Sequence, residues 1–151
     1  MGTAILDGLI SSGMDAANIS VSTNSAASSM AIAEKHGVAT FSLEESTANN
    51  LAAVDQADVV IVAVKPYLIT EVLEGLVEPH LKSDALIISV AAGITTAAME
   101  SVLPLGNPVV RAMPNTPAIV GRAVTGIALG SRATEAHQKL AEELFATVGK
   151  T

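Results

Sequence analysis

The chain has 151 residues and a formal net charge of −7, and half of its residues are hydrophobic although only Phe41, Tyr67 and Phe145 are aromatic. This length predicts one domain whose core is built from Ala, Val, Ile and Leu. The eight basic residues are scattered, which argues against nucleic acid as a partner because phosphate contacts need clustered Lys and Arg. The absence of cysteine excludes disulfides, thiol catalysis and cysteine-ligated zinc. No apolar run approaches the roughly 20 residues of a membrane span and no leader pattern is present, so we expect a cytoplasmic protein with no membrane partner.

The first half of the chain alternates helices and short strands. In chain order we expect a helix at 3–12, a strand at 19–22, a helix at 26–36 that Gly37 ends, a strand at 38–41, a helix or turn at 47–56 and a strand at 58–64. The last of these segments is a continuous apolar run. Such a run is typical of a strand that is buried on both faces of a parallel sheet.

The second half continues this alternation. We expect a helix at 67–76 directly after Pro66, a strand at 85–91, a helix at 96–102, strands at 107–112 and 123–129, and a closing helix at 134–148 with Thr134 as its N-cap. Strands that alternate with helices through short connections predict an α/β fold, a doubly wound, Rossmann-like parallel sheet. In such sheets ligands bind beyond the carboxyl ends of the strands.

The end of the strand at 19–22 offers Ser22, Thr23, Asn24 and Ser25 beside a predicted helix N-terminus. Dinucleotide folds that prefer NAD place an acidic residue here, and this chain has none between positions 19 and 30. These residues therefore suit an anion such as the 2′-phosphate of NADP. The alternative is a plain Ser/Asn cap of the next helix.

The end of the strand at 58–64 runs into Lys65 and Pro66. Proline has no N–H and holds the preceding residue extended, so the backbone is stiff where the strand leaves the sheet. A flat ring of a cofactor could lie against Ala63, Val64 and Pro66. The alternative is a strand terminator followed by a solvated lysine.

Two further strand ends carry small or polar residues. Ala91, Ala92 and Gly93 allow a ligand to approach the backbone closely, or form a tight turn into the next helix. Asn115 can donate and accept hydrogen bonds, as a nicotinamide amide requires, or it is a turn residue of the Asx or positive-φ kind. Arg111 is either an anion ligand or the partner of a local carboxylate or carbonyl.

The three histidines lie far apart in the sequence and show no metal-ligand spacing. We therefore predict no metal site, and we identify no dedicated catalytic side chain in this chain.

Taken together, the segments "VKPY", "SVAAGIT" and "RAMPNTPA", in this order and spacing, resemble the cofactor domain of pyrroline-5-carboxylate reductases. "MGTAILDGL" is similar to the end of that family's Gly-rich fingerprint and the following helix. The resemblance implies hydride transfer from NADPH, with NADH possible, to the C=N bond of a cyclic imine, which gives proline. It also implies a homo-oligomeric complete protein with a small-molecule substrate. The cofactor-binding residues that it implies are Gly2, Thr3, Thr23, Asn24, Ser25, Asn50, Ala63, Val64, Lys65, Pro66, Ala91, Ala92 and Asn115.

The family's pattern extends beyond this chain at both ends. Its first strand and first two fingerprint glycines are expected before Met1, and its helical dimerisation and substrate domain after Thr151. We therefore expect residues 1–151 to form an incomplete dinucleotide-binding domain that binds cofactor weakly and is inactive alone. Two alternatives remain: another NADP-linked reductase of similar fold, or a non-catalytic nucleotide-binding or assembly module.

The usual strand order 3-2-1-4-5-6 places the absent strand between the strands at 19–22 and 58–64. These two strands should then face a gap one strand wide. Either residues ahead of Met1 or another segment should fill that gap. Direct pairing of the two strands would contradict this expectation.

Overall fold

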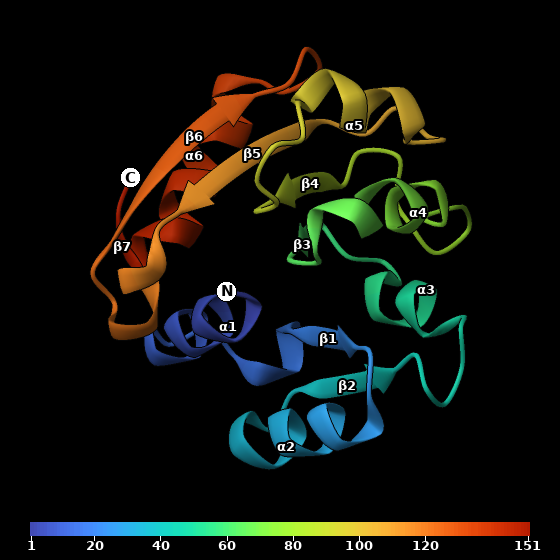
Figure 1. Ribbon diagram of the computed structural model, residues 1–151, viewed down its shortest axis with the longest axis vertical. Helices are drawn as coiled ribbons and strands as arrows, with labels where there is room; N and C mark the ends of the chain where they lie inside the picture. Colours follow the sequence, from blue (N-terminus) through green and yellow to red (C-terminus); the bar gives the residue numbers. More distant parts are fainter.

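The computed structural model describes residues 1–151 and shows an α/β fold (Figure 1). Its helices are α1 (Gly2–Ser11), α2 (Ala26–His36), α3 (Asn49–Val54), α4 (Ile69–Glu74), α5 (Thr96–Val102) and α6 (Glu135–Ala146). Its strands are β1 (Ser20–Thr23), β2 (Ala39–Ser42), β3 (Val59–Val62), β4 (Leu86–Ser89), β5 (Val109–Pro114), β6 (Ala123–Leu129) and β7 (Gly149–Lys150). Short 3-10 turns are η1 (Ala16–Asn18), η2 (Pro66–Leu68) and η3 (Thr116–Val120).

The strands form two sheets rather than one. β1 and β2 make a parallel pair, and the second sheet has the order β3-β4-β5-β6-β7. β3, β4 and β5 are parallel to their neighbours, whereas β6 is antiparallel to β5. The predicted doubly wound parallel sheet is confirmed, and β6 is an antiparallel strand that the sequence did not indicate. Only residues 115–122 connect β5 to β6, and a parallel crossover needs a dozen residues or more.

Local sequence signals set most helix ends as predicted. Gly37 adopts a left-handed conformation with φ 69° and ends α2. Thr134 caps α6 together with His137, whose ring nitrogen accepts a hydrogen bond from the Thr134 N–H. The predicted helix at 67–76 is divided, because a 3-10 turn at η2 precedes α4.

Helices cover both faces of the larger sheet and divide the core in two. On one face α1 and α6 pack against the sheet through residues that include Ile5, Leu9 and Phe145. On the other face α4 and α5 pack through residues that include Leu73 and Met99. β4 contributes to both cores, and all four of its residues are buried, as its apolar sequence predicts.

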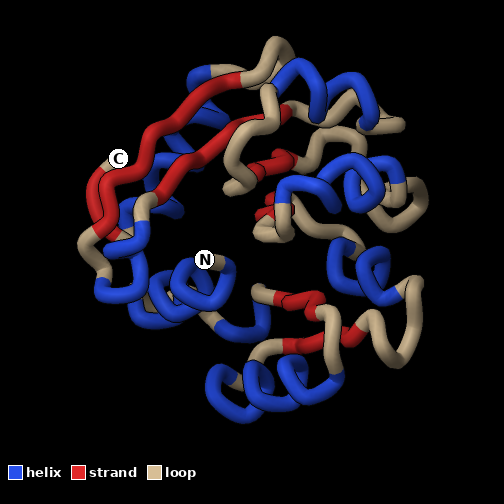
Figure 2. The backbone as a smooth tube through the Cα atoms, in the orientation of Figure 1, coloured by secondary structure: helices blue, strands red, loops and turns tan.

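β1 and β3 are neighbours that do not pair with each other. Figure 2 shows their strands in separate groups, with the β1–β2 pair apart from the larger sheet. Between them lies a groove of about 990 Å³ that is lined mostly by hydrophobic residues, and we call it the strand slot. The gap expected from the strand order is therefore confirmed. The slot also explains why Val59–Ile61 are only half-buried, although the sequence predicts burial on both faces.

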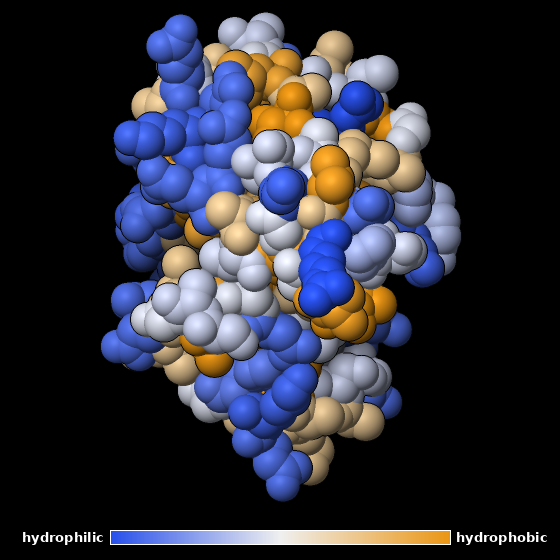
Figure 3. All heavy atoms as spheres, turned by 90° about the vertical axis from the view of Figure 1, so that its left-hand side faces the viewer, coloured by the Kyte–Doolittle hydropathy of each residue, from blue (hydrophilic) through white to orange (hydrophobic).

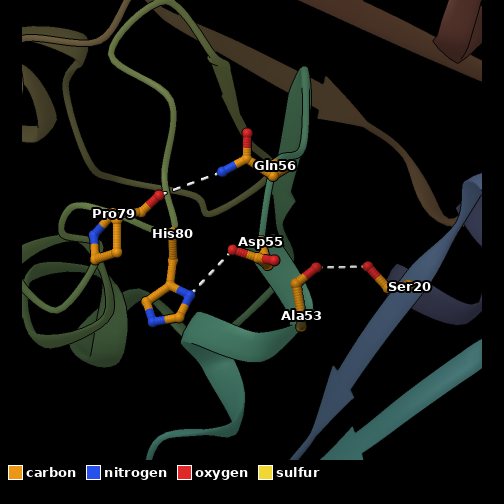
Figure 4. Close-up of polar contacts among 6 residues, drawn as sticks. All are labelled: Ser20, Ala53, Asp55, Gln56, Pro79 and His80. Carbon is orange, nitrogen blue, oxygen red and sulfur yellow. Dashed lines mark hydrogen bonds and ion pairs between the residues drawn. The ribbon is translucent and has the colours of Figure 1, made fainter.

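Polar contacts of α3 and the residues after it link the two sides of the strand slot (Figure 4). The Ser20 hydroxyl on β1 donates to the Ala53 carbonyl on α3. On the other side, Gln56 donates its backbone N–H to the His80 carbonyl at 3.0 Å, and the His80 ring contacts the Asp55 carboxylate at 3.1 Å. These contacts fix the β1–β2 pair beside β3 without direct strand pairing.

The surface is mixed in character. Figure 3, which turns the left-hand side of Figure 1 toward the viewer, shows mainly hydrophilic and intermediate residues with small, separate hydrophobic patches. Ile119, Val120 and Val124 are the most exposed aliphatic side chains of the η3–β6 region. None of the helices has both the length and the apolar content that a membrane span requires.

We expect Phe145→Ala to lower the free energy of unfolding by about 3–5 kcal/mol, because Phe145 is fully buried between α6 and the sheet. Glu143→Ala, on the exposed side of the same helix, is the control and should change it by less than ~0.5 kcal/mol. Urea unfolding followed by circular dichroism measures both. Equal losses in the two variants would contradict this description of the core.

Candidate functional site

The predicted site residues gather where the parallel strands end. β3, β4 and β5 run in the same direction, so the residues after Val62, Ser89 and Pro114 lie at one edge of the larger sheet. Helix α1 begins at the same edge, since a Cβ added at Gly2 would lie 3.2 Å from the Ala63 Cβ. Six of the predicted residues line the strand slot together: Gly2, Thr3, Thr23, Asn50, Ala63 and Val64. Asn24, Ser25, Lys65, Pro66, Ala91, Ala92 and Asn115 lie outside its lining.

The N-terminus of α1 is free to receive an anion. Met1 is the N-cap residue and provides no side-chain cap. The N–H groups of the first helical turn have no acceptor within the helix, and the helix dipole makes this end positive. Gly2 leaves room beside Ala63 that a larger side chain would fill. These features fit the pyrophosphate of a dinucleotide.

The N-terminus of α2 is already occupied by the chain's own groups. Ser25 caps the helix by accepting from the Ser28 N–H at 3.3 Å. The Thr23 hydroxyl bonds to the Ser25 carbonyl and to the Ser29 hydroxyl. These bonds support the alternative in which residues 23–25 cap the helix. Asn24 is exposed beside them.

Glu44 is the residue of this region that the sequence analysis missed. Its carboxylate accepts from the Ala26 N–H at 2.9 Å, at the N-terminus of α2. Glu44 lies outside positions 19–30, and the structure brings it there because β2 runs parallel to β1. The Leu43 N–H, one residue earlier, donates to the Thr23 carbonyl at 2.9 Å. The adjacency of the two strands is the signal that would have located this carboxylate.

Asn50 has an oriented amide at the end of β1. Its side-chain oxygen accepts from the Ser22 hydroxyl at 2.7 Å, so the amide nitrogen remains available to donate. The half-buried amide lies on α3 and lines the strand slot. This placement joins the end of β1 to α3.

The turns after β3 and β4 differ in what they expose. Lys65 is extended, with φ −63° and ψ 146°, as the following proline predicts, and Pro66 and Tyr67 are exposed beyond it. Ala91 is only 3% exposed and belongs to the second core cluster. Ala92 is exposed and remains accessible.

The connection after β5 orients Asn115. Its side-chain oxygen accepts from the Val124 N–H at 2.9 Å, and its own N–H donates to the Val124 carbonyl at 3.3 Å. Because Val124 N–H is a donor, this contact identifies the bonded side-chain atom as the oxygen and leaves the amide N–H₂ free. Asn115 has φ −86°, so the positive-φ alternative does not apply.

The charged side chains of Arg111 and Lys82, at the larger sheet, form hydrogen bonds with other groups of the chain. Arg111 donates to the Ile94 carbonyl at 3.3 Å and so holds the turn after β4. Of the two roles considered for Arg111, the structure therefore shows the one in which it pairs with a local carbonyl. The hydrogen bond from Lys82 to Asp58, at 2.6 Å, raises the pKa of Lys82. This pair precedes β4 and β3, at the edge opposite the candidate site.

The geometry agrees with the comparisons with known proteins. The model of the family described as "NADP oxidoreductase coenzyme F420-dependent" matches residues 1–93. The chain belongs to this family. The description applies to the family as a whole and does not by itself assign a cofactor to this member.

Curated relatives that match the chain both over residues 1–93 and over the residues after them are pyrroline-5-carboxylate reductases. The chain is 37% identical to the enzyme of Pasteurella multocida over 151 residues, which is 100% of this chain and 54% of the relative. It is 34% identical to that of Corynebacterium melassecola, over 99% of this chain and 54% of the relative. The solved structure of the Coxiella burnetii enzyme has a TM-score of 0.87 at 34% identity, over 99% of this chain and 53% of that one. The resemblance inferred from the motifs is confirmed, and the chain spans about half the length of the curated relatives it matches.

We expect Glu44→Gln to bind adenosine 2′-monophosphate about fivefold more tightly than the unchanged chain, because it removes a negative charge from the N-terminus of α2. Binding of adenosine without phosphate should change little. Glu45→Gln is the matched control, because the Ala26 N–H donates to Glu44 and not to this neighbouring carboxylate. Chemical-shift titration of the three proteins measures this effect. An equal gain in the control would contradict a specific role for Glu44.

Proposed function

We propose that this chain is the cofactor domain of a pyrroline-5-carboxylate reductase, which reduces the cyclic imine 1-pyrroline-5-carboxylate to L-proline with NADPH. The observation that carries the proposal is the match of essentially the whole chain to enzymes of that name at 34–37% identity. The arrangement at the sheet edge supports it, because an uncapped helix and two oriented amides surround the strand ends.

In this proposal the bound NADPH supplies the hydride, and the residues of this chain hold and orient the cofactor. The N–H groups at the start of α1, near Gly2 and Thr3, receive the pyrophosphate. Asn50 donates its free amide N–H to the adenosine ribose. Asn115 donates its free amide N–H to the carboxamide of the nicotinamide ring, while Val124 fixes the other end of the side chain.

NADPH is the proposed cofactor, and NADH is a weaker alternative. The family description names NADP, and the segment after β1 contains Ser, Thr and Asn in place of an acidic residue. Glu44 opposes this preference, because its carboxylate lies at the helix N-terminus where a 2′-phosphate would be stabilised. The preference should therefore be modest, about tenfold or ~1.4 kcal/mol.

The relatives extend to about twice the length of this chain, and in this proposal the substrate pocket lies in that additional part. A homo-oligomeric complete protein and a cytoplasmic location are parts of the same proposal.

The deciding experiment reads the encoding DNA on both sides of this segment, expresses the whole open reading frame and measures NADPH oxidation that depends on pyrroline-5-carboxylate. We expect turnover by that protein and none at a useful rate by residues 1–151. Without a positioned imine the chain lacks an orientation contribution that can reach about 7–11 kcal/mol. A complete protein that binds NADPH but does not reduce the imine would overturn the proposal. Turnover by residues 1–151 near the rate of the complete protein would refute the expected inactivity.

A paired substitution tests the role of Asn115 in the complete protein. Asn115→Asp keeps the acceptor for the Val124 N–H but removes the amide donor, so NADPH should bind about tenfold more weakly while thermal stability is retained. Asn115→Ala removes both the acceptor for the Val124 N–H and the amide donor, so it should lower thermal stability as well as NADPH affinity. Isothermal titration and thermal unfolding measure the two properties. Unchanged affinity in Asn115→Asp would show that the amide does not contact the cofactor.

A further inference from the structure

The turn between β4 and α5, residues 90–95, is anchored at both of its ends by side chains of the sheet. At its start, the Ser89 hydroxyl accepts from the Ala91 N–H at 3.2 Å. Near its end, the Arg111 guanidinium donates to the Ile94 carbonyl at 3.3 Å. Ser89 and Arg111 lie directly opposite each other on the parallel strands β4 and β5, so their side chains leave the same face of the sheet. The two residues therefore hold this turn together, and we call them the turn clamp.

Arg111 is not used for an ion pair. It takes part in none of the ion pairs of the chain, and its guanidinium makes one hydrogen bond within the chain, the bond to Ile94. Its Nε atom is buried and has no partner. A buried donor without an acceptor lowers stability. The placement of this arginine is therefore better explained by the position that it gives to the turn than by a gain in stability.

Between the two anchors, the turn exposes its backbone at Ala92 and Gly93. Both residues are exposed, and neither N–H has a hydrogen-bond partner within the chain. Gly93 has φ 78°, and a Cβ added there would meet nothing within 4 Å, so the space beside the backbone is open. Glycine permits many backbone conformations, so these free donors keep one orientation only when the ends of the turn are fixed. The turn clamp supplies that restraint.

The turn lies on the side of the site that the proposed function assigns to the nicotinamide ring. β4 and β5 are neighbours in the larger sheet (Figure 1), and β5 leads directly to Asn115. Asn50, which is assigned to the adenosine ribose, bonds instead to Ser22 of β1, in the smaller sheet. The two halves of a dinucleotide would thus meet different parts of the chain, and the turn after β4 would meet the nicotinamide half.

We propose that Ser89 and Arg111 are positioning residues, which orient the nicotinamide half of the cofactor through the backbone at Ala92 and Gly93 and do not contact the cofactor themselves. The inference rests on the proposed function, in which NADPH crosses this edge of the sheet. Loss of the turn clamp leaves the adenosine half of the site in place and allows the turn to move. It therefore weakens the binding of the nicotinamide half selectively.

The test uses the complete protein and two ligands, NADPH and 2′-phospho-ADP-ribose, which lacks the nicotinamide ring. Arg111→Met keeps the aliphatic stem and removes the donor, so NADPH should bind about tenfold more weakly while 2′-phospho-ADP-ribose stays within about twofold. The kcat at saturating NADPH should also fall, because a ring that is not held in place loses its orientation toward the imine. Arg111→Lys keeps a cationic donor for the single carbonyl and should recover most of both losses.

Arg132→Met is the matched control. Arg132 also donates to a backbone carbonyl, that of Glu100 at 3.5 Å, but it belongs to the turn after β6. β6 is antiparallel to β5, so this turn lies at the opposite edge of the sheet. Isothermal titration should show unchanged affinity of Arg132→Met for both ligands. Ser89→Ala removes the other anchor with a smaller change of side chain, and it should weaken NADPH binding alone by about threefold.

The ligand comparison separates positioning from a general loss of structure. Equal losses of affinity for the two ligands in Arg111→Met or Ser89→Ala would overturn the inference, because an altered fold affects both halves of the site. Unchanged NADPH affinity and kcat in either variant, while the unsubstituted protein binds NADPH, would overturn this inference alone. An unsubstituted complete protein that binds no NADPH would overturn the proposed function together with it.

Discussion

Two strands that flank a gap without pairing with each other are the constraint on which the rest of this structure depends. β1 and β3 each have a partner on one side only, and α3 with the loop after it holds them apart through the Ser20–Ala53 and Gln56–His80 bonds. The strand slot between them agrees with the strand order of a doubly wound sheet. It also leaves Val59–Ile61 half-buried and opens a large apolar groove within the fold.

The same constraint positions the groups that the proposed function assigns to a nucleotide. α1 begins beside the carboxyl end of β3, so its uncapped N-terminus meets the small residues at the sheet edge. Asn50 and Asn115 reach this edge from different elements, and in each the side-chain oxygen is engaged within the chain. In both residues the amide N–H₂ therefore remains available as a donor, while the oxygen fixes the side chain. This pre-organisation suits the recognition of a ribose and a carboxamide.

Opposing charges modulate this site. The helix dipole of α2 favours an anion, whereas the Glu44 carboxylate already satisfies that preference from within the chain. A 2′-phosphate must compete with this carboxylate, so the serine-rich segment after β1 is a weaker determinant of cofactor choice than it looks in the sequence. The relatives that match the chain extend to about twice its length, and the chemistry of the imine is assigned to that additional part only as a proposal.

The sequence alone determined the elements and the family. Apolar periodicity, Gly37 and Thr134 located helices α2 and α6, and the segments around Lys65, Ala91 and Asn115 indicated the reductase resemblance. The gap between β1 and β3 also followed from the order of strands. These features depend on local propensity and on chain order, which a sequence records directly.

Only the tertiary structure decided which distant groups meet. It made β6 antiparallel, placed Glu44 at the start of α2, turned Arg111 to the Ile94 carbonyl and buried the Ala91 side chain. Each of these outcomes depends on the distance between segments far apart in the chain. That distance is set by the packing of helices on the sheet, and no local pattern of residues specifies it.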